Sequence, residues 1–104
     1  MKKLCNVNEI AENSCKMVEI EGMKIALYKL DGKIHAIDAE CTHMKGPLCK
    51  GRILQGKYVQ CPWHGATFDL ETGEVMSGPT NKNLKVYKIK LENNEVYLDE
   101  GYEE

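Results

Sequence analysis

The chain contains two short segments, Cys41-Thr42-His43 and Cys61-Pro62-Trp63-His64, in which one and two residues, respectively, separate a cysteine from a histidine. Seventeen residues, 44–60, separate the two segments. Thiolate and imidazole groups are common ligands of iron, zinc and copper in proteins. Because each segment supplies one sulfur donor and one nitrogen donor, the pattern predicts a metal centre held between two loops.

Two kinds of metal centre fit these four ligands. In a [2Fe-2S] cluster of mixed ligation, Cys41 and Cys61 would bind the inner iron while His43 and His64 bind the outer iron. A structural zinc ion also accepts two cysteines and two histidines. Zinc sites, however, usually pair cysteine with cysteine and histidine with histidine at short spacing, whereas each half of this pattern is mixed. The spacing therefore favours the cluster, with a zinc site or a chance proximity of cysteines and histidines as the alternatives.

The longer segments that begin with these pairs resemble the cluster loops of Rieske-type ferredoxins. They read Cys-Thr-His-Met-Lys-Gly-Pro-Leu at 41–48 and Cys-Pro-Trp-His-Gly-Ala-Thr-Phe-Asp at 61–69. Thr72-Gly73 and Ser77-Gly78-Pro79 are similar to the family's turn and to the proline loop that covers the cluster. The resemblance implies one [2Fe-2S] cluster per chain, held by the four residues above, in a soluble low-potential ferredoxin.

Several positions depart from the high-potential relatives. Quinol-oxidising Rieske proteins have an extra cysteine in each loop, joined as a disulfide, where this chain has Gly46 and Trp63. They also have a serine and a tyrosine, which donate hydrogen bonds to sulfur, where this chain has Ala66 and Phe68. Fewer donors stabilise the reduced cluster less. We therefore predict a reduction potential of about −150 mV, at the low end of the Rieske range.

The remaining cysteines, Cys5, Cys15 and Cys49, are odd in number, so we predict no disulfide framework and expect Cys49 to be a thiol near the cluster rim. Asn83 stands where relatives commonly continue with a proline. This departure bears on the shape of the covering loop.

Alternating apolar residues and short turns predict an all-β fold. We expect a three-stranded meander over 15–20, 23–30 and 33–38, with Met23, Ile25 and Leu27 on one face. Asp31-Gly32 is a typical hairpin turn. A closing hairpin turns at Asn93-Asn94 and returns through the strand 95–98.

The predicted architecture is a Rieske-like antiparallel β-sandwich or meander that forms a single domain over 1–104. A cluster-binding subdomain over about 40–78 is inserted between the meander and the closing hairpin. Gly46, Gly65 and Gly78 are expected to frame the cluster, whereas Gly51, Gly56 and Gly73 are expected to be ordinary loop glycines.

Composition restricts the partners and the compartment. The formal net charge of −2 gives no reason to expect nucleic acid or an anionic membrane as a partner. No apolar stretch has the length of a secretory signal or a membrane span. We therefore expect a cytoplasmic monomer.

His35 is the remaining one of the three histidines and is expected to be a surface or half-buried side chain rather than a ligand. A Rieske oxygenase also needs a mononuclear iron site of two histidines and one carboxylate. Once His43 and His64 are assigned, one histidine is too few for that site. The chain is therefore predicted to be an electron-transfer protein rather than an enzyme.

The predicted function is to carry one electron from a ferredoxin reductase to a terminal oxygenase or similar oxidoreductase. A fixed small subunit of a multi-component reductase, such as a nitrite reductase, is the alternative with the same ligands, and a structural zinc domain is the third interpretation. A docking surface is expected at the cluster end, with an apolar rim of Met44, Pro47, Leu48, Trp63 and Pro79. Lys45, Lys50, Arg52 and Lys57 would give this end a positive potential.

Overall fold

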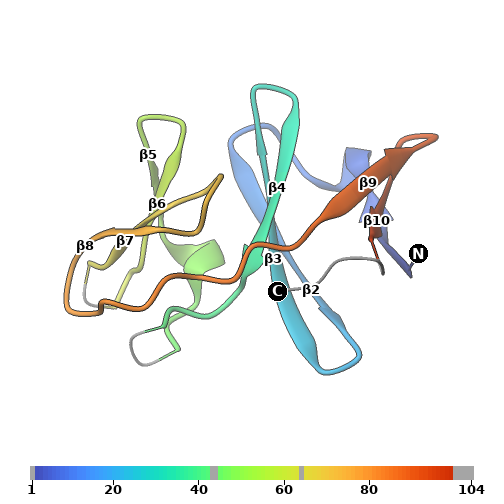
Figure 1. The fold of residues 1–104 in the computed structure, drawn as a ribbon. Coiled ribbons are helices and arrows are strands. Elements are labelled where there is room, and N and C mark those ends of the chain that lie inside the picture. The colour runs from blue at the N-terminus through green and yellow to red at the C-terminus, as the bar shows by residue number, and fades with distance from the viewer. Residues whose placement is uncertain (1, 43–44, 64, 100–104) are drawn as a thin grey trace.

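The computed structural model describes residues 2–42, 45–63 and 65–99. Within these ranges the chain forms short antiparallel strands and two 3-10 turns (Figure 1). The strands are β1 (Lys2–Asn6), β2 (Ser14–Ile20), β3 (Met23–Leu30), β4 (Lys33–Asp38), β5 (Arg52–Leu54), β6 (Tyr58–Gln60), β7 (Thr67–Asp69), β8 (Val75–Ser77), β9 (Ile89–Glu92) and β10 (Glu95–Leu98). The 3-10 turns are η1 (Val7–Glu9) and η2 (Leu48–Lys50). The predicted all-β fold class is confirmed.

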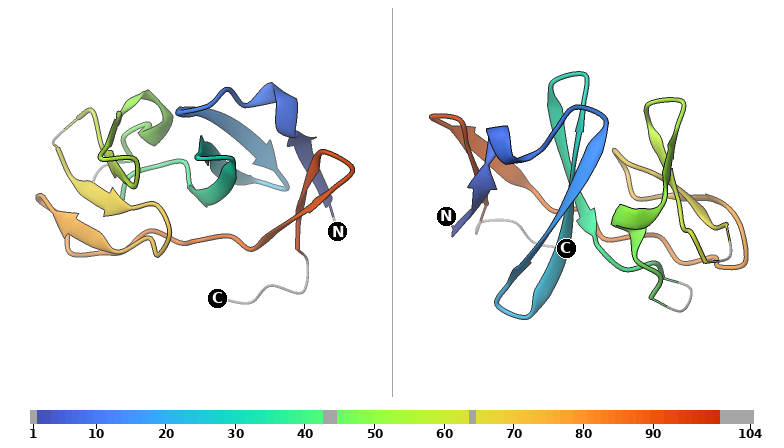
Figure 2. Two further views of the ribbon diagram at one scale, coloured as in Figure 1. Left: turned by 90° about the horizontal axis from the view of Figure 1, so that it is seen from above. Right: turned by 180° about the vertical axis from the view of Figure 1, so that it is seen from behind.

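Three sheets follow one another along the long axis of the molecule, whose extents are 39 × 27 × 18 Å. The β5-β6-β7-β8 sheet lies at one end, β2-β3-β4 in the middle, and β1-β10-β9 at the other end, as Figures 1 and 2 show. The segment 78–88 runs along the molecule and connects the first end to the last. The two ends are therefore distinct regions joined through the central sheet.

The central sheet is the predicted meander, with β3 and β4 at the predicted bounds and β2 one residue longer. Its two turns, Glu21-Gly22 and Asp31-Gly32, have positive φ at both positions. Such turns match the right-handed twist of the strands that they join. Asn93 and Asn94 also have positive φ and join β9 to β10, as predicted.

Strand β3 separates two hydrophobic cores because its side chains alternate between the faces of the sheet. Ile25 and Leu27 face one core, against which Met23 packs, as predicted. Ala26 and Tyr28 face the other core. This second core also contains both predicted ligand cysteines, so the central sheet supports the metal-binding end directly.

The sequence did not predict β1, which pairs with β10 from Lys2 opposite Leu98 to Asn6 opposite Glu95. Two lysines at its start obscure the apolar pattern, although Leu4 and Cys5 are buried in the core at this end. This strand was therefore missing from the predicted fold.

The absence of a disulfide was also predicted wrongly. Cys15 on β2 is bonded to Cys49 in η2, with 5.3 Å between their Cα atoms. Cys49 is therefore not the thiol that the sequence predicted. None of the helical segments in the described part of the chain has the length and apolarity that a membrane crossing requires.

Candidate metal centre

The first ligand loop is closed by two backbone hydrogen bonds around Cys41. The amide of Cys41 donates to the carbonyl of Gly46 at 2.8 Å, and the amide of Lys45 donates to the carbonyl of Cys41 at 3.0 Å. The loop leaves the central sheet just after β4 and returns at Leu48, whose amide donates to the carbonyl of Ala39 at 3.0 Å. Both ends of the loop are thus anchored.

The second ligand loop repeats this pattern around Cys61. The amide of Cys61 donates to the carbonyl of Ala66 at 2.7 Å, and the amide of Gly65 donates to the carbonyl of Cys61 at 3.1 Å. In both loops, therefore, the cysteine amide bonds five residues ahead and its carbonyl accepts from four residues ahead. Strands β6 and β7 hold the ends of the second loop. Two unrelated segments of chain thus present a cysteine from equivalent loops.

The two loops meet beside the side chain of Cys61. Cys41 and Cys61 are 2% and 4% exposed and belong to the same core. A Cβ added to Gly46 in the first loop would lie 2.5 Å from Sγ of Cys61 in the second. A side chain at position 46 would therefore occupy the space beside that sulfur. Two buried sulfur donors from equivalent loops, with a glycine beside one of them, fit an iron–sulfur cluster.

His43, His64 and Met44 lie outside the described residues. The binding of the two histidines to the outer iron therefore stays a prediction from their spacing.

A third segment, residues 78–82, packs against both loops. A Cβ on Gly78 would lie 2.5 Å from Cα of Ala66 in the second loop. Oγ1 of Thr42 in the first loop donates to the carbonyl of Lys82 at 2.8 Å and lies 3.1 Å from Oγ1 of Thr80. Residues 78–82, the predicted covering loop, are thus connected to the first ligand loop by Thr42.

Asn83 has a defined place in this covering loop. Its Oδ1 accepts a hydrogen bond from the amide of Val75 at 3.0 Å. A proline has no side-chain acceptor, so this asparagine holds the start of β8 in a way that a proline would not.

The exposed surface near the loops partly matches the predicted apolar rim. Trp63 is 55% exposed, and its ring atoms lie 3.3–3.4 Å from the position of a Cβ on Gly46. It therefore both packs on the first loop and faces solvent. Leu48 was wrongly assigned to the rim, because it is fully buried in the core beside the ligand cysteines. Met76 on β8 is 48% exposed and was not predicted.

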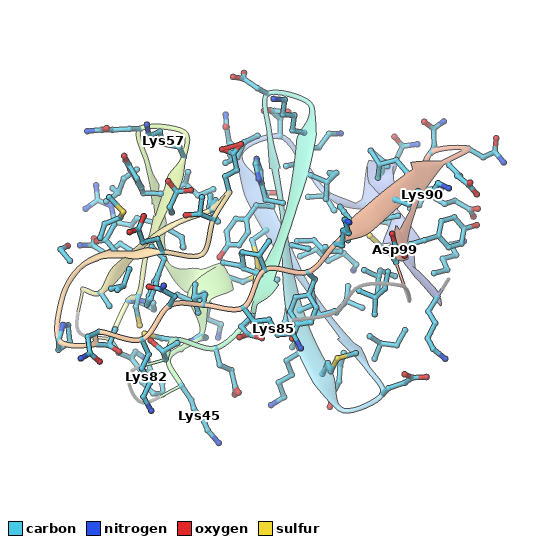
Figure 3. The ribbon with its side chains drawn as sticks, in the orientation of Figure 1. Lys45, Lys57, Lys82, Lys85, Lys90 and Asp99 are labelled. Carbon is cyan, nitrogen blue, oxygen red and sulfur yellow. A yellow bond between two sulfur atoms is a disulfide. The ribbon has the colours of Figure 1, made fainter. Side chains whose placement is uncertain are left out.

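The exposed cations are distributed differently from the prediction. Lys45 and Lys82 lie at the ligand-loop end, whereas Lys57 lies at the far tip of the hairpin between β5 and β6 (Figure 3). Lys45 and Lys82 are carried by the two loops that the Thr42 hydrogen bonds hold together. The positive surface at this end thus includes Lys82 of the covering loop, which was not predicted, and does not include Lys57.

Two glycines that were predicted to be ordinary are required by close packing. A Cβ on Gly51 would collide with the carbonyl oxygen of Gln60, and one on Gly73 with the carbonyl oxygen of Leu84. Gly46 and Gly78 frame the site as predicted, whereas Gly56 has open space around it. Gly65 has φ +79° and no close neighbour, so its backbone conformation, rather than space, favours glycine.

The walls of the second loop are apolar. Ala66 and Phe68 are fully buried and carry no hydroxyl group. The low predicted reduction potential depends on the absence of hydroxyl donors at these two positions. Both positions lie inside the core.

His35 is half-buried on β4. Burial lowers the pKa of its imidazole, an effect that Lys33 reinforces and that the nearby carboxylates of Glu71 and Asp69 partly oppose. No group of three or more histidine, cysteine or acidic side chains able to hold a metal ion occurs among the described residues. The described part of the chain therefore offers no second metal centre.

Comparison with known proteins decides the family. The family model described as "Rieske [2Fe-2S] domain" matches residues 1–88. The chain belongs to this family. A similar curated protein is the ferredoxin component of the naphthalene 1,2-dioxygenase system of Pseudomonas putida, which is 37% identical over 93 residues, covering 89% of this chain and 88% of that one.

Two solved structures extend the comparison. The Sphingomonas yanoikuyae B1 ferredoxin superposes with a TM-score of 0.87 at 31% identity, covering 94% of this chain and 96% of that one. A chain in a complex of reduced oxygenase and oxidized ferredoxin of carbazole 1,9a-dioxygenase gives 0.85 at 28% identity, covering 92% and 89%. The predicted family, fold class and [2Fe-2S] cofactor are confirmed, and the similarity to ferredoxins indicates an electron carrier.

Proposed function

We propose that Cys41, His43, Cys61 and His64 bind one [2Fe-2S] cluster and that this cytoplasmic chain carries one electron from a ferredoxin reductase to a terminal oxygenase. The observation that supports this most strongly is the pair of equivalent loops that bring Cys41 and Cys61 together in one buried core. The ferredoxin component of a dioxygenase system and the ferredoxin in an oxygenase complex, both reported above, support the choice of partners.

Within this proposal the chain's own residues supply binding, burial and access. The cluster would supply reversible one-electron chemistry. The buried thiolates of Cys41 and Cys61 would bind the inner iron, and the apolar side chains of Ala66 and Phe68 line the core beside them. The imidazoles of His43 and His64 would be uncharged ligands, which would make the bound cluster easier to reduce than one held by four thiolates. Residues 40–78 act as the cluster-binding subdomain of one domain.

We place partner docking at a surface that we call the loop-end rim, formed by Lys45, Trp63, Met76, Pro79 and Lys82. Trp63 and Met76 are exposed apolar side chains, which interfaces favour. Lys45 and Lys82 are exposed cations. A partner with an acidic surface around its electron-accepting site would be attracted to this end and oriented by it.

The alternative function is that of a fixed small subunit of a larger reductase such as a nitrite reductase. That subunit would use the same ligands and the same loops. Permanent association distinguishes the two functions, so size-exclusion chromatography of the chain from its native source separates them. We expect a monomer that elutes free of a reductase, and stable co-elution with one would support the alternative.

A redox titration of the purified chain tests the proposal. We expect two irons and two acid-labile sulfides per chain, and a transition of one electron at about −150 mV, because hydroxyl donors to the sulfurs are missing. A zinc-containing protein without sulfide would contradict the proposed cofactor. A strongly positive midpoint would contradict the role of Ala66 and Phe68 while leaving the cofactor in place.

A further inference from the structure

The Cys15–Cys49 disulfide joins the central sheet to the metal-binding end. Cys15 lies on β2, opposite Tyr28 on β3, and Cys49 lies in η2, directly after the first ligand loop. The two cysteines are 34 residues apart in sequence. A covalent bond of this span restricts the unfolded chain strongly, in addition to the noncovalent packing between β2 and η2.

The turn η2 contacts the structural frame of both ligand loops. Leu48, next to Cys49, is fully buried in the core that contains Cys41 and Cys61. On the other side of Cys49, Gly51 packs so closely on the carbonyl of Gln60 that no Cβ fits between them. Gln60 is the residue before Cys61. Movement of η2 would therefore disturb the end of the first loop and the start of the second.

The disulfide is also accessible from solvent. Cys15 and Cys49 are half-buried and line an open cavity of about 500 Å³. Tyr28 lines the same cavity, and its buried hydroxyl has no hydrogen-bond partner among the described residues. Burial raises the pKa of this hydroxyl, so it stays a protonated donor at neutral pH. The cavity thus brings the two half-buried cysteines together with an unused polar group.

We propose that Cys15–Cys49 is a reducible clamp, opened by a protein dithiol that enters this cavity, and that its state sets how firmly the chain retains its metal centre. A thiolate of the dithiol attacks one sulfur, which forms a mixed disulfide and releases the other cysteine as a thiolate. The second thiol of the reductant then attacks the mixed disulfide. The Cys15–Cys49 bond is reduced by two electrons, and the dithiol is oxidised to its own disulfide.

The readout at the metal centre rests on the proposed function, but the clamp itself does not. Opening the disulfide releases the constraint on the unfolded chain and should shift the unfolding equilibrium on the order of 100-fold towards the unfolded state. The ligand loops adjoin η2, so the rate of cluster loss should rise at least severalfold. In a compartment that thiols keep reducing, the fraction of chains that carry this disulfide depends on the local thiol–disulfide reduction potential.

The first experiment measures the bond without reference to any metal. The full chain, isolated without reductant, is treated with thioredoxin, a protein dithiol, and its free thiols are counted by alkylation and mass spectrometry. We expect a gain of two alkylated cysteines, mapped to Cys15 and Cys49, and the reverse change after oxidation with diamide. Isolation of both as free thiols that diamide does not join would overturn the proposal.

The second experiment measures the consequence. Iron release to a chelator and chemical unfolding are measured for three forms of the chain: with the Cys15–Cys49 disulfide intact, with this disulfide reduced, and in the variant Cys15→Ser/Cys49→Ser. We expect the chain with the reduced disulfide and the variant to lose iron at the same rate, which is higher than that of the chain with the intact disulfide. Reductant should have no further effect on the variant. Equal rates of iron release with the disulfide intact and reduced would overturn the proposal. If the protein contained no cluster, the proposed function would fail, while unfolding would still test the clamp.

Discussion

The two ends of the molecule are both small antiparallel sheets over a hydrophobic core, yet they are stabilised differently. At the N-terminal end, strands of four or five residues pair with one irregularity, between Lys3 and Cys5, and Lys3 and Glu95 form an ion pair of 2.6 Å across β1 and β10. At the ligand-loop end each strand of the β5–β8 sheet has three residues. Among the described residues, no ion pair joins side chains within 45–82. Short ladders leave this end dependent on the contacts between its loops.

Close backbone packing gives the same contrast. Gly22 and Gly32, in the turns of the central sheet, have open space around them. Gly46 and Gly78 instead bring the ligand loops and the covering loop into direct contact. The comparison suggests that the ligand-loop end is stabilised by cross-links between loops: the cluster, the disulfide and the Thr42 hydrogen bonds. A bound metal contributes to folding free energy in small domains of this kind.

Removal of a ligand cysteine should have the largest effect. Cys41→Ala or Cys61→Ala deletes a sulfur donor of the inner iron, so we expect loss of the cluster and a large loss of stability at this end. Iron and acid-labile sulfide analysis with visible absorption measures it. Cys5→Ala is the matched control, because Cys5 is a buried cysteine in the other core. A full complement of iron in Cys61→Ala would contradict the assignment.

Gly46→Ala should have the next largest effect. The added methyl group would lie 2.5 Å from Sγ of Cys61, and such overpacking costs about 1–3 kcal/mol. We expect reduced iron content as well as reduced stability, measured by metal analysis and chemical unfolding.

Gly56→Ala provides the control for this variant. Gly56 has open space but a φ of +67°, so alanine there costs about 1–2 kcal/mol through its backbone conformation alone. Its iron content should stay normal. Equal iron loss in both variants would show that the close approach at Gly46 has no special role.

The sequence predicted those parts of the fold that depend on local pattern. Strands β3, β4 and β10 alternate clearly and are bounded by strong turns, so their limits were predicted correctly. The two ligand loops were equally clear, since cysteine and histidine at short spacing have few other uses. The prediction of Cys41 and Cys61 as ligands therefore required no knowledge of the tertiary structure.

The remaining features depend on contacts between distant residues. The bond between Cys15 and Cys49 joins residues that no local pattern relates. The burial of Leu48 depends on where η2 packs, and the need for glycine at position 51 depends on the carbonyl of Gln60. These contacts are determined by the tertiary structure and cannot be read from the spacing of residues along the chain.

Thr42→Val should weaken the contact between the first ligand loop and the covering loop. The substitution removes the hydroxyl that donates to Lys82 and contacts Thr80, so we expect a loss of about 1–2 kcal/mol and faster iron release. Chemical unfolding and chelator assays measure both effects. Thr42→Ser, which restores the hydroxyl, should behave as wild type. If the valine variant matched the serine variant, the hydrogen bonds would contribute nothing.

Charge at the loop-end rim should have a smaller effect. In Lys45→Gln/Lys82→Gln we expect anionic ferricyanide to oxidise the reduced cluster roughly three- to tenfold more slowly at low ionic strength, because two positive charges that attract the anion are removed. Oxidation by cationic hexaamminecobalt(III) should accelerate, and salt should remove both differences. Lys57→Gln, at the far tip of its hairpin, is the control. Equal effects from Lys57→Gln would indicate net charge rather than a local surface.

The smallest effect concerns His35, on the central sheet. Because burial lowers the pKa of its imidazole below 6.5 in the folded state, the unfolded state takes up the proton first as pH falls. The stabilising contribution is thus complete above pH 6.5 and declines as the solution is acidified towards the folded pKa. Urea unfolding at pH 7 and pH 5 should show a smaller decline for His35→Gln than for wild type. An identical decline in both would contradict this.

Electron-nuclear double resonance of the dithionite-reduced protein tests the mixed-ligand centre most directly. The account predicts two irons per chain and couplings from two directly bound histidine nitrogens, with one coupling lost or altered in His43→Cys and likewise in His64→Cys. A centre without nitrogen couplings, or a colourless zinc protein with no inorganic sulfide, would contradict it.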